Sequence, residues 1–220
     1  MTKLRNLLAA GAALTLATGA LATAAQAEDF QPKTAGTLML NVRLTDVSPK
    51  AGDSILTAAG VDSTLNADVN DSVVPTVGIS YFFTDNVAIE AIAGTSHHTV
   101  KATGPGTNVK VHETWVLPPV VTLQYHFAPA AKVSPYVGAG LNYMIFYGDK
   151  DLNGFKVKLK DGFGYALQAG VDIATTGKYS INLDVKKVFF DTNASINGGT
   201  LKSKVNLDPW VVSAGVGYKF

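Results

Sequence analysis

Apolar and polar residues alternate with a period of two along most of the chain. In segment 161–174, one face carries Tyr165 and Leu167, and the other carries Gln168 and Asp172. Alternation of this kind predicts β-strands that each have one apolar face and one polar or glycine-rich face. Eight such segments are expected, near 36–48, 72–83, 87–97, 115–127, 134–147, 161–174, 179–190 and 207–220.

The connections between these segments alternate in length. The short connections lie near 84–86, 128–133 and 175–178. The longer connections lie near 49–71, 98–112, 148–160 and 191–206. An even number of strands with short and long connections at opposite ends is typical of outer-membrane barrels. The pattern therefore predicts an all-β fold: an eight-stranded antiparallel transmembrane β-barrel formed by residues 28–220.

Aromatic residues gather at both ends of the predicted strands, as the two interfaces of a bilayer favour. At the short-turn ends they are Tyr81, Phe83, Tyr125, Phe127, Tyr136, Tyr179, Tyr218 and Phe220. At the long-loop ends they are Trp115, Phe146, Tyr147, Phe163, Phe189 and Trp210. The alternative is a soluble sandwich or a lipocalin-like barrel with its apolar faces turned inward. The two aromatic belts and the terminal phenylalanine argue against that alternative.

The first residues have the order of a secretory signal peptide. A basic head with Lys3 and Arg5 precedes the apolar run 7–21, and small residues follow at 25–27. The apolar run is shorter than the roughly 20 residues that a transmembrane helix needs. We therefore expect residues 1–27 to be a cleaved signal peptide.

Charge and cysteine content exclude several classes of function. Two of the 18 basic residues lie in the predicted signal peptide, which leaves 16 basic against 17 acidic residues in the mature chain. This balance gives no electrostatic reason to expect a nucleic-acid partner. The chain has no cysteine, so disulfides, thiolate catalysis and cysteine-based zinc sites are excluded, and no cofactor is predicted.

The predicted interior of the barrel combines charged and polar side chains. An eight-stranded barrel is nearly filled by its inward side chains. Arg43 and Lys186 are expected to pair with Glu90, Asp172 or Asp184 and to plug the lumen, because buried charges need partners. At the outer end, an apolar path would use Met39, Ile92 and the facing loops. The predicted lumen residues are Met39, Arg43, Glu90, Ile92, Gln124, His126, Asp172, Asp184 and Lys186.

Pro118 and Pro119 interrupt the segment 115–127, which otherwise alternates like a strand. Proline has no N–H group for a ladder, and two in succession remove one donor on each side of the strand. We expect a bulge or a gap between strands, where lipid cannot replace the lost hydrogen bonds. One interpretation is a simple bend in the wall. The functional interpretation is a lateral opening through which an apolar solute leaves the lumen for the lipid.

An enzyme is the less favoured interpretation. Ser96, His97, His98 and His112 lie near one long connection, and a histidine pair can also bind metal. No motif joins a nucleophile, a base and an orienting group, so neither catalysis nor a metal site is predicted.

The last eight residues, SAGVGYKF, resemble the terminal signature of bacterial outer-membrane barrels. The residues that carry this resemblance are Gly215, Tyr218 and Phe220. It implies that the barrel assembly machinery recognises the chain as a partner during insertion.

Four longer stretches resemble, in the same order, segments of the OmpW family, which includes AlkL-type hydrocarbon importers. They are FTDNVAIEAIAG, LPPVVTLQYHF, SPYVGAGLNY and LDPWVVSAGVGYKF. The resemblance covers nearly the whole mature chain and implies passive uptake of small hydrophobic molecules across the bacterial outer membrane. The alternative is a structural or receptor-type barrel that acts through its extracellular loops. The oligomeric state stays open.

Overall fold

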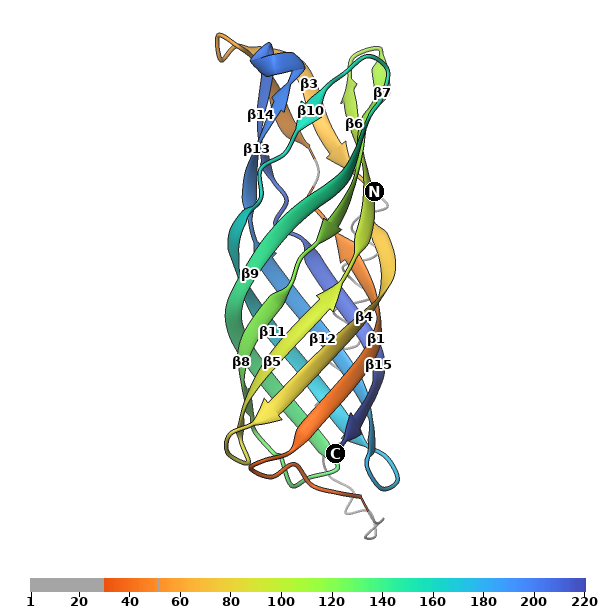
Figure 1. Cartoon of the computed structure of the whole chain (residues 1–220), viewed down its shortest axis with the longest axis vertical. Helices are drawn as coiled ribbons and strands as arrows, with labels where there is room; N and C mark the ends of the chain where they lie inside the picture. The colour runs from red at the N-terminus through yellow and green to blue at the C-terminus, as the bar shows by residue number, and fades with distance from the viewer. Residues whose placement is uncertain (1–29, 51) are drawn as a thin grey trace.

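The computed structural model describes residues 30–50 and 52–220, so the predicted signal peptide lies outside the described residues. Eight strands pair around a closed circle, with β1 hydrogen-bonded to both β4 and β15 (Figure 1). This confirms the predicted eight-stranded antiparallel barrel. Its strands are β1 (Leu38–Ser48), β4 (Ser72–Phe82), β5 (Val87–Gly94), β8 (Val120–His126), β9 (Val133–Asp151), β11 (Gly162–Ala174), β12 (Tyr179–Phe189) and β15 (Trp210–Lys219). Within the described part of the chain, no helix is long and apolar enough to cross a bilayer.

The barrel turns its apolar faces outward. On β12, Ile181 and Leu183 are 46% and 43% exposed. Asn182, which lies between them, and Lys186, further along the strand, are each only 1% exposed. Such an arrangement would be unfavourable in water, because it exposes aliphatic side chains and buries polar ones. It suits a wall whose outside contacts hydrocarbon.

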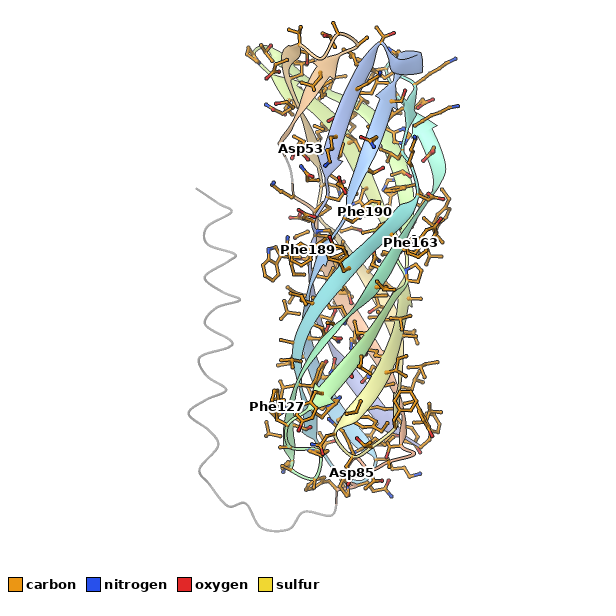
Figure 2. The ribbon with its side chains drawn as sticks, turned by 90° about the vertical axis from the view of Figure 1, so that its left-hand side faces the viewer. Asp53, Asp85, Phe127, Phe163, Phe189 and Phe190 are labelled. Carbon is orange, nitrogen blue, oxygen red and sulfur yellow. The ribbon has the colours of Figure 1, made fainter. Side chains whose placement is uncertain are left out.

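Exposed aromatic side chains form two belts on the outside of the barrel. Figure 2 shows Phe127 near the short-turn end, and Phe163 and Phe189 at a second level about half-way up the molecule. The prediction of belt positions is wrong for two residues. Tyr136 is buried inside the barrel, and Phe146 packs against the interior cluster that contains Phe190. Both stand at inward positions of β9. Whether a side chain points into or out of the barrel decides its burial, even when the residue lies near the end of a strand.

The long connections fold as a second sheet that continues the barrel upward. Its strands are β2 (Asp53–Thr57), β3 (Asp62–Val69), β6 (Ser96–Gly104), β7 (Thr107–Leu117), β10 (Val157–Lys158), β13 (Asp191–Ile196) and β14 (Leu201–Asn206). A short 3-10 helix, η1 (Asn197–Gly199), joins β13 to β14. The sheet runs in the order β10-β13-β14-β2-β3-β6-β7-β9 (Figure 1), and we call it the extension.

Two predicted segments are each divided between the barrel and the extension. Segment 87–97 is split at Thr95 into β5 and β6, and segment 115–127 is split at Pro118 and Pro119 into β7 and β8. The two breaks face each other across neighbouring strands. The wall therefore changes from barrel to extension at the level of the prolines.

Gly140 and Gly215 mark two close approaches between barrel strands. A Cβ atom at Gly140 would overlap the backbone carbonyl of Val121 on β8, and one at Gly215 would overlap that of Val42 on β1. Gly215 therefore has a structural reason to be glycine, whatever its part in assembly.

Replacing Gly140 by Val should lower the free energy of unfolding by about 1 to 3 kcal/mol, because the strands must separate to admit the side chain. Urea unfolding in detergent micelles measures this difference. The control is Ala139→Val, which enlarges an exposed side chain at the neighbouring position. Equal stability of the two variants would contradict the close approach.

Candidate functional site

A network centred on Glu90 fills the lower half of the barrel. The guanidinium of Arg43 donates from Nη2 to Glu90 Oε1 at 2.5 Å and from Nε to Asn182 Oδ1 at 2.6 Å. Gln124 and Gln168 donate to the other carboxylate oxygen of Glu90 at 3.1 and 2.9 Å. Glu90 is fully buried, so these donors replace the water that its charge would otherwise hold.

Asp184 and Lys186 extend this network on β12. The ammonium of Lys186 contacts Asp184 and lies 3.5 Å from Glu90 Oε2. Asp184 Oδ2 also accepts hydrogen bonds from Gln168 at 2.6 Å and from the Tyr136 hydroxyl at 2.7 Å. The tyrosine at the inward position of β9 thus serves the interior network.

Lys33 closes the network at the short-turn end, and the sequence analysis missed it. Its ammonium donates to Asp172 Oδ2 at 2.6 Å and lies 3.0 Å from His126 Nδ1. The segment before β1 is held across this end by backbone bonds from Gln31 to Gly177 and from Lys33 to Pro129. Lys33 belongs to no strand, so strand periodicity carried no signal for it.

These side chains form a charge-balanced plug. Three cations, Lys33, Arg43 and Lys186, face three carboxylates, Glu90, Asp172 and Asp184, all of them buried. The space among the plug residues leaves no room for a water molecule. We use "plug" for these six side chains and the Tyr136, Gln124, Gln168, His126 and Asn182 side chains bonded to them.

Met39 does not lie where we expected it. It stands opposite Lys219 and Ser80, at the short-turn end of β1, so the expectation of an outer path lined by Met39 is wrong. The chain enters β1 from that end, and its second residue cannot reach the outer half. Ile92, five residues into β5, does line the outer cavity.

An apolar cavity of about 110 Å³, the chamber, lies above the plug. Its lower wall comes from barrel residues such as Ile92, Val120 and Met144, and its upper wall from extension residues such as Ile55 and Val157. More than a third of its lining residues thus belong to segments that we had treated as loops. The alternation of apolar and polar residues in Leu65–Val69 was the signal that could have revealed it.

The chamber is bordered by few polar atoms, and these are satisfied. His98 Nδ1 lies 2.9 Å from the carbonyl of Asn70, so this nitrogen carries the proton, and His98 Nε2 accepts from the Ser96 hydroxyl at 2.9 Å. Burial lowers the pKa of His98, which keeps the ring uncharged at neutral pH. The chamber therefore offers no charged group at this wall.

Of the serine and histidines considered for catalysis, Ser96 and His98 meet, but His97 and His112 lie elsewhere. His97 packs against Trp115, with ring centroids 5.0 Å apart, and His112 lies between Asp149 and Asp151, at 3.3 Å from each. The group that orients His98 is a backbone carbonyl instead of a carboxylate. Residues 30–50 and 52–220 contain no cluster of three metal-binding side chains.

The wall beside the chamber has an interruption in its hydrogen-bonded ladder. Paired residues between β5 and β8 end at Ile92–Val120 and resume between β6 and β7 at Ser96–Val116, in the same register. The unpaired stretch between them sets Ala93, Gly94 and Thr95 opposite Leu117, Pro118 and Pro119. We call this stretch the wall gap. Ala93, Gly94 and Pro118 also line the chamber.

The prolines disturb the ladder toward β9 less than the ladder toward β5 and β6. Toward β9 the register runs on from Val120–Asn142 to Leu117–Ile145, and the carbonyl of Pro119 accepts a bond from the Tyr143 amide at 3.1 Å. Our expectation of one donor lost on each side agrees with the structure, because neither proline is paired with β9 in the ladder, although the Pro119 carbonyl keeps its acceptor role. The longer interruption, of three residue pairs, therefore faces β5 and β6.

Comparison with known proteins identifies the family. The sequence profile described as the OmpW family matches residues 34–220. The chain belongs to the OmpW family. It is 42% identical to an uncharacterized outer-membrane protein of Sinorhizobium fredii over 69% of this chain and 67% of the relative. It is 30% identical to the dibenzothiophene metabolism operon protein PahQ of Pseudomonas aeruginosa, over 70% of this chain and 75% of that protein.

The fold agrees with a solved member of the same group. The crystal structure of the outer membrane protein OprG of Pseudomonas aeruginosa superposes with a TM-score of 0.81 at 29% identity, covering 87% of this chain and 99% of OprG. The protein is accordingly an OmpW-family barrel of the outer membrane. Proteins of this family are transport or structural barrels, and nothing in these comparisons indicates an enzyme.

The residues of the terminal signature lie at the lower belt of this OmpW-family barrel. The Tyr218 ring lies 4.9 Å from that of Phe220 and 5.1 Å from that of Tyr179. The amide of Phe220 donates to Leu38 at 2.8 Å. The ring contact with Tyr179 holds the end of β15 against β12, and the bond to Leu38 holds it against β1. Recognition by the barrel assembly machinery stays a prediction.

Glu90→Ala should destabilise the barrel by about 3 to 5 kcal/mol, because it leaves the buried charges of Arg43 and Lys186 without their shared partner. Chemical unfolding monitored by tryptophan fluorescence measures the loss. Glu113→Ala is the control, since Glu113 meets only the exposed Lys150, at 3.7 Å, and its loss should change little. A Glu90 variant as stable as this control would contradict the plug.

Proposed function

We propose that this barrel passes small, neutral, hydrophobic molecules from the outer surface into the hydrocarbon of the outer membrane. The solute occupies the chamber and leaves sideways through the wall gap. The observation that carries this proposal is the position of the chamber: it ends below at the plug and borders the unpaired stretch of wall at Ala93, Gly94 and Pro118.

A straight path to the periplasm is unfavourable for such a solute. The plug would have to break several buried ion pairs and hydrogen bonds at once, and an apolar molecule supplies no groups to replace them. The hydrocarbon outside the wall gap offers the solute an environment like the chamber. Transfer between two apolar environments avoids returning the solute to water.

The chemistry of the chamber favours neutral solutes. Its floor includes Lys186, whose charge is already compensated by Asp184 and Glu90, and His98 at its wall is uncharged. A cavity of about 110 Å³ is of the same order as the roughly 150 Å³ apolar cavities that accept benzene. The name of the relative PahQ, which refers to dibenzothiophene metabolism, supports a neutral aromatic or aliphatic solute.

Movement of chamber side chains would admit larger solutes. Met144 and Phe146 line the chamber from β9, and methionine in particular adapts its shape at low cost. The wall gap needs no ladder bond to break before it widens, since its three residue pairs are already unpaired. Passage then depends mainly on side-chain motion.

A second candidate function is a structural or receptor-type barrel. The observation that favours it is the extension, which presents a folded β-sheet surface beyond the barrel (Figure 1). Uptake of a neutral hydrophobic probe into liposomes, with and without the protein, separates the two. Faster uptake with protein supports transport, and equal uptake supports the receptor reading.

Replacing Pro118 by Val and Pro119 by Thr should slow uptake of the hydrophobic probe at least fivefold, because the new N–H groups allow the ladder to close across the wall gap. The initial rate of uptake in proteoliposomes measures the effect. The variant should retain the stability of the parent or exceed it.

The matched control is Pro135→Val, which replaces a proline of β9 that pairs with Val171 near the short-turn end, far from the wall gap. This control should transport like the parent. Unchanged uptake in the Pro118 and Pro119 variant would rule out the wall gap as the exit.

A further inference from the structure

One outward face of the extension is rich in lysine. Strands β10, β13 and β14 are neighbours, and their apolar residues Val157, Ala194 and Val205 turn inward. The lysines of β10, β14 and the adjoining chain are exposed. We call the set the lysine face: Lys156, Lys158, Lys160, Lys202 and Lys204.

The lysines lie in rows across the three strands. Ser195 of β13 pairs with Lys158 on one side and with Lys202 on the other. Asn193, one row lower, pairs with Lys204, and the backbone of Lys160 is bonded to the adjacent Thr192. With strands about 4.8 Å apart, two lysine stems flank a strip of neutral polar residues roughly 10 Å wide.

Three carboxylates border the five lysines of this face: Asp151, Asp161 and Asp191. Asp151 accepts a bond from the Val157 amide at 2.9 Å, next to Lys156. Asp191 pairs with Lys204 at 2.7 Å. Asp161, next to Lys160, accepts a bond from the Phe146 amide at 2.9 Å. In the described part of the chain, no ion pair joins Lys156, Lys158, Lys160 or Lys202 to a carboxylate. With five lysines against three carboxylates, the face carries two positive charges in excess.

The lysine face begins directly above the outer aromatic belt. The Lys187 ammonium lies over the rings of Trp210 and Phe189, at 5.1 and 5.9 Å from their centroids. Belt aromatics mark the interface with the lipid head groups. Asn193 and Ser195 are four and six residues beyond Phe189, or about 13 and 20 Å along the strand before its tilt is considered. The rows thus stand at the level of the polar head groups and the sugars attached to them.

The opposite side of the extension differs in charge. Asp68 of β3 pairs with Lys101 of β6, and Asp53, Asp62 and Asp71 lie in the same connection as Asp68. The excess of lysine is consequently a property of one face and not of the whole extension.

We propose that the lysine face binds the phosphate groups of the phosphorylated glycolipid in the outer leaflet. Lysine ammonium groups bind phosphate oxygens as mobile point charges, and Ser195 and Asn193 supply neutral hydrogen-bonding groups between them. Basic side chains near an anionic lipid surface each add roughly fivefold to the affinity. This binding would fix the rotation of the barrel in the leaflet, with the lysine face toward glycolipid. It does not depend on the transport proposed above.

The test uses the full-length barrel in detergent micelles and bisphosphorylated lipid A as the probe. The triple variant Lys158→Gln, Lys160→Gln and Lys202→Gln should bind the probe at least tenfold more weakly than the parent. Dephosphorylated lipid A should bind the parent as weakly as the phosphorylated form binds the variant. Raising the salt concentration should narrow the difference, as expected for charge pairing.

The matched control removes the same charge elsewhere on the extension, with Lys101→Gln, Lys110→Gln and Lys150→Gln. This control should bind like the parent, and replacement of Lys158, Lys160 and Lys202 by Arg should restore binding. Thermal unfolding checks that all variants are folded. The proposal is overturned if the Gln variant of the lysine face and its control bind alike, or if removal of the phosphates leaves the affinity of the parent unchanged.

Discussion

Every backbone polar group within the hydrocarbon must find its partner inside the protein, and the rest of this structure depends on that constraint. The chain satisfies it by closing eight strands into a circle, with β15 paired to β1. Glycines at the close approaches, such as Gly140 and Gly215, let neighbouring strands reach bonding distance. Against this background, three successive unpaired positions in one ladder are an exception. They occur where Pro118 and Pro119 withhold their donors.

The same constraint applies to side chains and divides the barrel into two halves. In the lower half, charges are admitted because each has a partner: Arg43 with Glu90, Lys33 with Asp172. In the upper half the lining is aliphatic and encloses the chamber. An apolar solute that binds in the chamber would make no favourable contacts with the charged plug. In the transport function that we propose, the exit lies in the wall, where the unpaired stretch borders the chamber.

The sequence predicted the barrel because a period of two is a local property of each strand. The inward positions of Asn182, Asp184 and Lys186 follow from that period alone. The extension was missed because its short strands were interrupted by turns and were read as loops. Lys33 was missed because it reaches Asp172 from a segment without periodicity. The prolines predicted a break, but only the folded chain reveals that its longer side faces Ala93, Gly94 and Thr95, while the register toward β9 and the bond from Tyr143 to Pro119 persist.

The most direct test of lateral exit is a reversible cross-link over the wall gap. Thr95 stands opposite Leu117 in the register shared by the flanking pairs. Opposed residues in a ladder are about 4.5 to 5.5 Å apart at Cα, which a disulfide can span. The chain has no native cysteine, and T95C/L117C leaves both prolines in place. Uptake of the hydrophobic probe by T95C/L117C should fall at least fivefold on oxidation and recover with reductant. The control is L167C/K187C, which bridges an intact β11–β12 pair and should transport equally in both states. Equal uptake by oxidised and reduced T95C/L117C would contradict lateral exit.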